Sequence, residues 1–182
     1  VCALDRFLRR AWWLYVRDCL ATCLHYLGVM PSILMAMEPS ESDLDHSVRF
    51  GFGAGVDPKL HAPFEARFGF PLSEGWAMTE TGAGAVISNN EPDRLVGKSA
   101  LGLVPDWLEV RLINEAGHVV RRGEPGELLV RRKGPQPRRG FFREYYKNAA
   151  ATKEAWADGW FHTGDVVRQE ENGFLFFVDR RK

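Results

Sequence analysis

The decisive stretch of the sequence reads Glu74-Gly75-Trp76-Ala77-Met78-Thr79-Glu80-Thr81-Gly82, and it begins within a predicted strand at residues 71–76. It presents a large aromatic ring, then two hydroxyls around one carboxylate, and then glycines that let a ligand approach the backbone closely. Mg²⁺ is usually held by one or two carboxylates together with phosphate oxygens and water, so Glu80 beside Thr79 suits a nucleotide and its metal ion. The stretch therefore predicts a ligand-binding loop at the end of a strand.

Two further motifs follow in the second half of the chain. Residues 159–165 read GWFHTGD, and residues 173–182 read GFLFFVDRRK. In order and spacing, these two motifs and the stretch at 74–82 resemble three signatures of the acyl-adenylate-forming enzymes. That superfamily contains acyl-CoA synthetases, the adenylation domains of peptide synthetases and luciferases. The resemblance runs over essentially the whole chain, and residues 142–146 with 176–181 are most similar to the carnitine/crotonobetaine-type CoA ligases.

The resemblance implies an α/β fold, namely the second half of the large adenylate-forming domain. Strand–helix units are then followed by a small, antiparallel, barrel-like β subdomain. We expect residues 1–96 to be the α/β part of the AMP-binding domain. Residues 97–182 would be the β subdomain with nucleotide-site loops, ending at the hinge.

Periodicity and turn residues predict the individual elements. An amphipathic helix is expected at 4–20, and a helix at 58–68 should begin after an Asp57 N-cap and end at Gly69. Pro63 lies inside that helix and is expected to kink it or limit its length. The other expected elements are strands at 22–27, 48–52, 71–76, 108–113, 119–120 and 127–130, and helices at 31–37 and 148–156.

Composition narrows the functional class. The 24 basic and 24 acidic residues cancel, so the global charge does not indicate a nucleic-acid partner. Charges interrupt the apolar N-terminal region too often for a membrane span. The three cysteines are few and odd in number, which argues against a disulfide framework. We therefore expect a reducing, cytoplasmic location. The chain begins with Val1 and stops within a motif, so we expect a piece of a longer protein.

The resemblance assigns roles to individual side chains. Trp76 occupies the position of an adenine-stacking tyrosine, so the phenol hydroxyl is lost. Thr79 matches a contact to the α-phosphate, and Glu80 matches the Mg²⁺ ligand. Asp165 matches a carboxylate that accepts hydrogen bonds from both ribose hydroxyls, a task for an acceptor-only group.

The remaining assigned positions flank these four. Arg180 matches a second contact near ribose and phosphate, and Lys182 matches the hinge about which a C-terminal lid rotates. The other cofactor-binding positions are Gly53, Ala54, Gly55, Gly75, Ala77 and Met78. Taken singly, these residues have structural alternatives: Trp76 as a core residue, Asp165 as a turn carboxylate paired with Arg180, and Glu80 as a surface charge.

The implied function is that of an acyl-CoA ligase, a type of enzyme with roles in fatty acid metabolism. It uses ATP, Mg²⁺ and coenzyme A and acts on a small carboxylic acid, and a homo-oligomer is among the expected states. The alternatives are a non-catalytic remnant that binds nucleotide or acyl-CoA, and an adenylation domain that loads a carrier protein. The expected phosphate loop with lysine does not precede the motif in this sequence, and the lid would follow Lys182. We therefore expect this polypeptide alone not to form acyl-adenylate at a useful rate.

A cationic run lies between the first and second motifs and contains Arg131, Arg132, Lys133, Arg138, Arg139 and Arg143. Arginine forks suit the phosphates of coenzyme A. Because charge runs usually indicate exposure, a solvated loop is the favoured interpretation.

Overall fold

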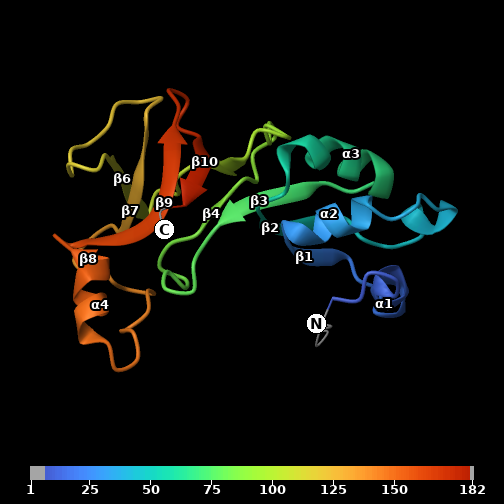
Figure 1. The fold of residues 1–182 in the computed structure, drawn as a ribbon, viewed down its shortest axis with the longest axis horizontal. Coiled ribbons are helices and arrows are strands. Elements are labelled where there is room, and N and C mark those ends of the chain that lie inside the picture. Colours follow the sequence, from blue (N-terminus) through green and yellow to red (C-terminus); the bar gives the residue numbers. More distant parts are fainter. Residues whose placement is uncertain (1–6, 181–182) are drawn as a thin grey trace. The chain divides into compact units, whose positions relative to one another are not determined.

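The computed structural model describes residues 7–180, which form two compact units. Of the described residues, 7–74 and 92–99 form the first unit, and 75–91 and 100–180 form the second. The fold class is confirmed as mixed α/β, with helices and two kinds of sheet (Figure 1). No helix in the described part of the chain has the length and apolarity needed to cross a membrane.

The first unit is built on parallel strands. β1 (Cys23–Leu27) pairs with β2 (Phe50–Ala54), and β2 pairs with the first half of β3 (Leu72–Trp76). Its helices are α1 (Trp12–Asp18), α2 (Val29–Met35) and α3 (Pro58–Phe68), with a short 3₁₀ helix η1 (Glu41–Leu44) between α2 and β2 (Figure 1). Parallel strands joined by helices are the arrangement in which α/β folds bind ligands at the carboxyl ends of the strands.

The helix α3 forms as its sequence predicts. The Asp57 side chain accepts a hydrogen bond from Lys59 N–H at 2.9 Å, and Gly69 ends the helix in the left-handed conformation with φ of 73°. Pro63 does not end the helix, which continues to Phe68.

Other boundaries differ from the prediction. Of the helix expected at 4–20, residues 4–6 lie outside the described residues, and the described part becomes helical only at Trp12, because Leu8–Ala11 form a turn. The helix expected at 31–37 spans Val29–Met35, and the strand expected at 48–52 spans Phe50–Ala54. At residues 119–120 the strand is reduced to a single bridge from Val119 to Ile113.

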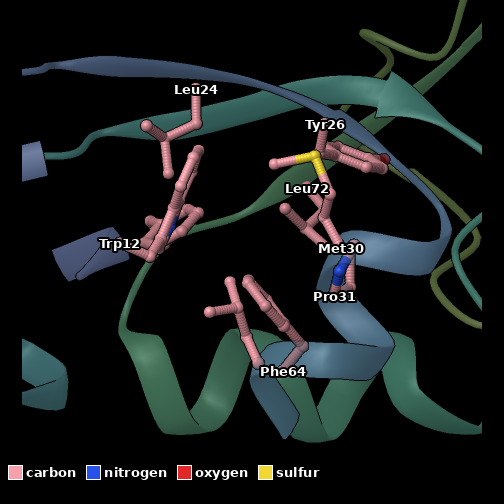
Figure 2. A pocket seen from close by; sticks show the side chains of 9 residues that line it. Trp12, Leu24, Tyr26, Met30, Pro31, Phe64 and Leu72 are labelled. Atoms are coloured by element: carbon pink, nitrogen blue, oxygen red, sulfur yellow. The ribbon is translucent and has the colours of Figure 1, made fainter. Parts of the chain in front are cut away.

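The core of the first unit is rich in aromatic rings, including Trp13, Phe64, Phe68 and Phe70. Figure 2 shows a small cavity beside it, with Trp12, Leu24, Met30 and Phe64 among the side chains at its wall. The cavity holds about 10 Å³, roughly the space of a single water, and its lining is apolar. It is therefore a packing gap and not a substrate pocket.

The second unit is an antiparallel sheet with the strand order β5-β10-β9-β7-β6. Its strands are β5 (Ala100–Gly102), β6 (Leu108–Ile113), β7 (Pro125–Arg132), β9 (Trp160–Gln169) and β10 (Leu175–Arg180), and β8 (Trp156–Ala157) pairs with β9. The second half of β3 pairs with β4 (Ile87–Ser88). The helix α4 (Ala149–Ala155) precedes β8 (Figure 1). Among the described residues β5 does not pair with β6, so the unit is an open sheet and not a closed barrel.

The cationic run forms the expected solvated loop only in part: Lys133, Arg138, Arg139 and Arg143 are exposed and lie outside helices and strands. Arg131 and Arg132 belong to β7 and are half-buried. Their guanidinium carbons lie 4.2 Å from the ring centre of Trp160 and 4.9 Å from that of Trp107, and Arg138 lies over Trp156. Such cation–π contacts stabilise the arginines against the sheet.

A polar network in the first unit joins residues 92–99 to α3. Arg94 donates to both oxygens of Glu65, at 2.6 and 2.9 Å, and to Leu72 O at 2.9 Å. His61 Nδ1 accepts from Gly97 N–H at 3.2 Å. Burial by itself would raise the pKa of Glu65, but the hydrogen bonds from Arg94 and from Leu72 N–H bring that pKa below its ordinary value.

We predict that Arg94→Ala lowers the free energy of unfolding by about 1–3 kcal/mol, because a largely buried carboxylate loses its cation. A depressed native pKa contributes stability above the unfolded value of 4.5, and this contribution is lost as the pH falls through the native value. The gap between wild type and variant in urea unfolding should therefore narrow from about pH 7 to about pH 3. The exposed Arg49 provides the control Arg49→Ala. A gap that stays constant with pH would contradict this role for the pair.

Candidate functional site

The loop after β3 is held by one of its own threonines. Thr81 is fully buried, and its Oγ1 accepts from Met78 N–H at 2.9 Å and donates to Met78 O at 3.0 Å. Thr79 is exposed and Glu80 is half-exposed. The sequence predicts two hydroxyls around the carboxylate, but the Thr81 hydroxyl is used inside the loop. Only the Thr79 hydroxyl and the Glu80 carboxylate are presented outward.

A second segment, residues 140–145, braces this loop. Gly84 N–H donates to Gly140 O at 3.0 Å, and Phe142 N–H donates to Glu80 O at 2.8 Å. A β-carbon at Gly84 would lie 2.2 Å from the Phe141 ring, so the close approach requires glycine there. Sequence reasoning used residues 142–146 only as a subfamily resemblance and missed their place beside the loop.

Residues 140–145 also contact the Glu80 side chain, through the phenol of Tyr145. Tyr145 Oη donates to Glu80 Oε1 at 3.1 Å. Burial raises the pKa of the Tyr145 phenol, and the hydrogen bond to Glu80 raises it further. The phenol therefore stays protonated, as a donor, at neutral pH.

The first and second motifs meet at one hydrogen bond. Trp76 Nε1 donates to Asp165 Oδ2 at 2.8 Å, across 89 residues of sequence. The exposed fraction is 5% for Trp76 and 6% for Asp165. A buried carboxylate needs such a donor because it has lost its hydration.

The third motif reaches the same carboxylate. In the pairing of β10 with β9, Arg180 lies opposite Asp165, and Arg180 Nε is 3.5 Å from Asp165 Oδ1. The Arg180 side chain is 65% exposed, so this pair is open to solvent on the arginine's side. Behind Asp165, its own N–H donates to Thr163 Oγ1, which donates to Leu128 O at 2.7 Å. All three motifs thus contribute to one cluster in the second unit.

The position of Trp76 bears on its expected role. Its indole belongs to the core cluster of the second unit, together with Ala85, Ile87 and Leu101. The edge that carries Nε1 is used for Asp165. Adenine stacking on this ring stays a prediction.

The glycine turn of the first unit is organised by an acid that sequence reasoning did not single out. Glu74 is 4% exposed, and its Oε1 accepts from Val56 N–H at 2.9 Å. Burial raises the pKa of Glu74, and hydrogen bonds from Val56 and Gly55 N–H offset this only in part. Gly55 has φ of 77°, and a β-carbon at Gly53 would lie 2.1 Å from Tyr26 O. The turn at Gly53, Ala54 and Gly55 is therefore fixed by its backbone geometry and by Glu74.

Glu80, the candidate Mg²⁺ ligand, is not part of a cluster of metal-binding side chains among the described residues. No group of three or more His, Cys, Asp or Glu side chains within residues 7–180 could hold a metal ion. One half-exposed carboxylate, Glu80, does fit an Mg²⁺ ion that arrives with a nucleotide, because phosphate oxygens and water then supply the other ligands. Lys182, the expected hinge, lies outside the described residues.

Comparison with protein families identifies the chain. A family model described as "AMP-binding enzyme" matches residues 1–146. The chain belongs to the AMP-binding enzyme family. Among curated relatives of this family member, the crotonobetaine/carnitine–CoA ligase of Escherichia coli (strain ATCC 8739) is 34% identical over 179 residues. That of Shigella flexneri is 33% identical over the same length. The match covers 97% of this chain and 34% of each relative, so the family member spans about a third of their length.

Solved structures agree on the fold of this family member. A benzoate CoA ligase from Burkholderia xenovorans LB400 matches with a TM-score of 0.81 and 22% identity, over 97% of this chain and 35% of that one. An anthranilate CoA ligase in complex with anthranoyl-AMP matches with a TM-score of 0.80 and 19% identity, over 95% and 32%. These similarities place the two units in the fold of adenylate-forming CoA ligases.

The pair formed by Trp76 and Asp165 generates a matched comparison. Trp76 and Trp156 are both 5% exposed, but Trp156 Nε1 has no hydrogen-bond acceptor among the described residues. We predict that Trp76→Phe lowers the free energy of unfolding by about 1–3 kcal/mol more than Trp156→Phe does, because only the former leaves a buried carboxylate oxygen, Asp165 Oδ2, without its donor. Urea unfolding of the two variants measures the difference. Equal losses would show that the hydrogen bond to Asp165 carries no weight.

Proposed function

We propose that this chain is the nucleotide-binding part of an ATP-dependent acyl-CoA ligase. In that reaction a carboxylate oxygen of the acid attacks the α-phosphorus of ATP, and pyrophosphate leaves. The thiol of coenzyme A then attacks the acyl carbon of the adenylate, and AMP leaves. The enzyme must hold two anions against each other while negative charge develops at phosphorus.

The hydrogen bond from Trp76 to Asp165 carries this proposal. It joins two family motifs that lie 89 residues apart and leaves the Asp165 carboxylate in a fixed orientation. An ionised carboxylate accepts hydrogen bonds and donates none, so it suits the two hydroxyls of a ribose. Arg180, 3.5 Å away and largely exposed, is available to a phosphate or ribose oxygen.

The loop of Thr79 and Glu80 supplies the phosphate side of the proposed site. The exposed Thr79 hydroxyl would donate to an α-phosphate oxygen, and Glu80 would hold Mg²⁺. When bound, the ion neutralises charge on the phosphate oxygens. The backbone of Gly75, Ala77 and Met78 would line the nucleotide, and cofactor binding by the turn at Gly53–Gly55 stays a prediction.

The relatives support a proposal for the substrate class. Because curated relatives are crotonobetaine/carnitine–CoA ligases, we propose acids of that kind as the first to test in a longer protein that includes this chain. The cytoplasmic location and the homo-oligomeric state stay predictions. Catalysis by the isolated polypeptide is not part of the proposal.

Calorimetric titration of the chain with AMP tests the proposed site. We predict saturable binding, weakened about tenfold or more by Asp165→Asn, because the amide keeps a single acceptor oxygen and no charge. The control is Arg138→Ala, which removes a cation that lies over Trp156 and should leave AMP affinity unchanged. Wild-type affinity in Asp165→Asn, or no binding by the wild type, would contradict the proposal.

A further inference from the structure

The carboxylate of Glu80 is held at one oxygen by a residue to which no role has been assigned. Tyr145 Oη donates to Glu80 Oε1 at 3.1 Å, from 65 residues further along the chain. Glu80 Oε2 accepts no hydrogen bond from the described residues. The carboxylate therefore has one oxygen anchored and the other open.

The backbone of Tyr145 is itself held by two hydrogen bonds to the start of α4. Tyr145 N–H donates to Thr152 Oγ1 at 3.0 Å, and Tyr145 O accepts from Asn148 N–H at 3.1 Å. Asn148 caps α4 by accepting from Ala151 N–H at 3.0 Å. The Tyr145 ring lies 4.7 Å from that of Phe142, centre to centre. These contacts tie Tyr145 to the start of α4, so its hydroxyl is held in place.

Glu80 is tied to the same segment through its main chain. Phe142 N–H donates to Glu80 O at 2.8 Å. With the phenol on Oε1, both ends of the residue are bound to residues 142–145. One anchor on the main chain and one on the carboxylate restrict the rotamers of the Glu80 side chain, which a half-exposed glutamate would otherwise sample freely.

We propose that Tyr145 is a positioning residue that fixes the Glu80 carboxylate for a divalent cation carried by a nucleoside triphosphate. This inference rests on the proposed function, since it needs a nucleotide at the loop. Tyr145 does not touch the cation; it orients the oxygen that would. Pre-orientation of this kind lowers the cost of ordering a ligand side chain on binding.

The neighbouring tyrosine provides a matched control. Tyr146 is 85% exposed, so Tyr146→Phe removes the same hydroxyl from a solvent position. We predict that Tyr145→Phe weakens calorimetric binding of MgATP about tenfold and leaves binding of AMP in EDTA within about twofold of wild type. Tyr146→Phe should change neither affinity.

A double-mutant cycle separates positioning from support of the fold. In a Glu80→Gln background, Tyr145→Phe should cause no further loss of MgATP affinity, because the charged oxygen that it orients is gone. Unchanged MgATP binding by Tyr145→Phe would overturn the inference and leave the proposed function standing. A parallel loss of AMP binding in EDTA, with or without a lower melting temperature, would also overturn it. A wild type that binds neither nucleotide would overturn both proposals.

Discussion

A carboxylate that is buried in a protein must find hydrogen-bond donors, and in the second unit this constraint falls on Asp165. Its donors are the indole of Trp76 and, at longer range, the guanidinium of Arg180. The strand that carries it is irregular: the pairing of β7 with β9 shifts between Glu127 and Leu129, and Gly164 has φ of 71°. Such irregularities re-aim side chains along a strand. Asp165 therefore joins three motifs that are far apart in sequence, because its carboxylate accepts from Trp76 and lies beside Arg180.

The other candidate ligand groups are positioned in the same manner, by buried or half-buried polar partners from elsewhere in the chain. Thr81 closes the loop from inside, and residues 140–145 brace it from outside. In the first unit, Glu74 fixes the turn after β2. Each partner forms hydrogen bonds with backbone groups that lose their contact with water when they are buried. Each also leaves a neighbouring group free to contact a ligand.

Local signals in the sequence predicted the elements whose ends are chemically marked. α3 has an aspartate cap and a terminal glycine, and both act as expected, while α4 begins after Asn148. Where the ends carry no such mark, as for α1 and α2, the predicted boundaries were displaced. The β subdomain was predicted as barrel-like, but edge pairing is set by long-range register, and the sheet stays open. The family motifs indicated candidate site residues. Periodicity indicates which face of an element a residue lies on, but it does not identify the residue's hydrogen-bond partner. The inward turn of Thr81 and the bond from Tyr145 to Glu80 could not be read from spacing.

The most direct test of the account is the nuclear magnetic resonance signal of the Trp76 indole N–H during titration with AMP. Its donor atom bonds to Asp165, the carboxylate on which the proposed ribose contact depends. The account predicts that this signal, assigned by its absence in a Trp76 variant, shifts progressively and saturably, while that of Trp156 shifts far less. Saturable binding of AMP that leaves the Trp76 signal unmoved would contradict it, because the nucleotide would then be held away from Asp165.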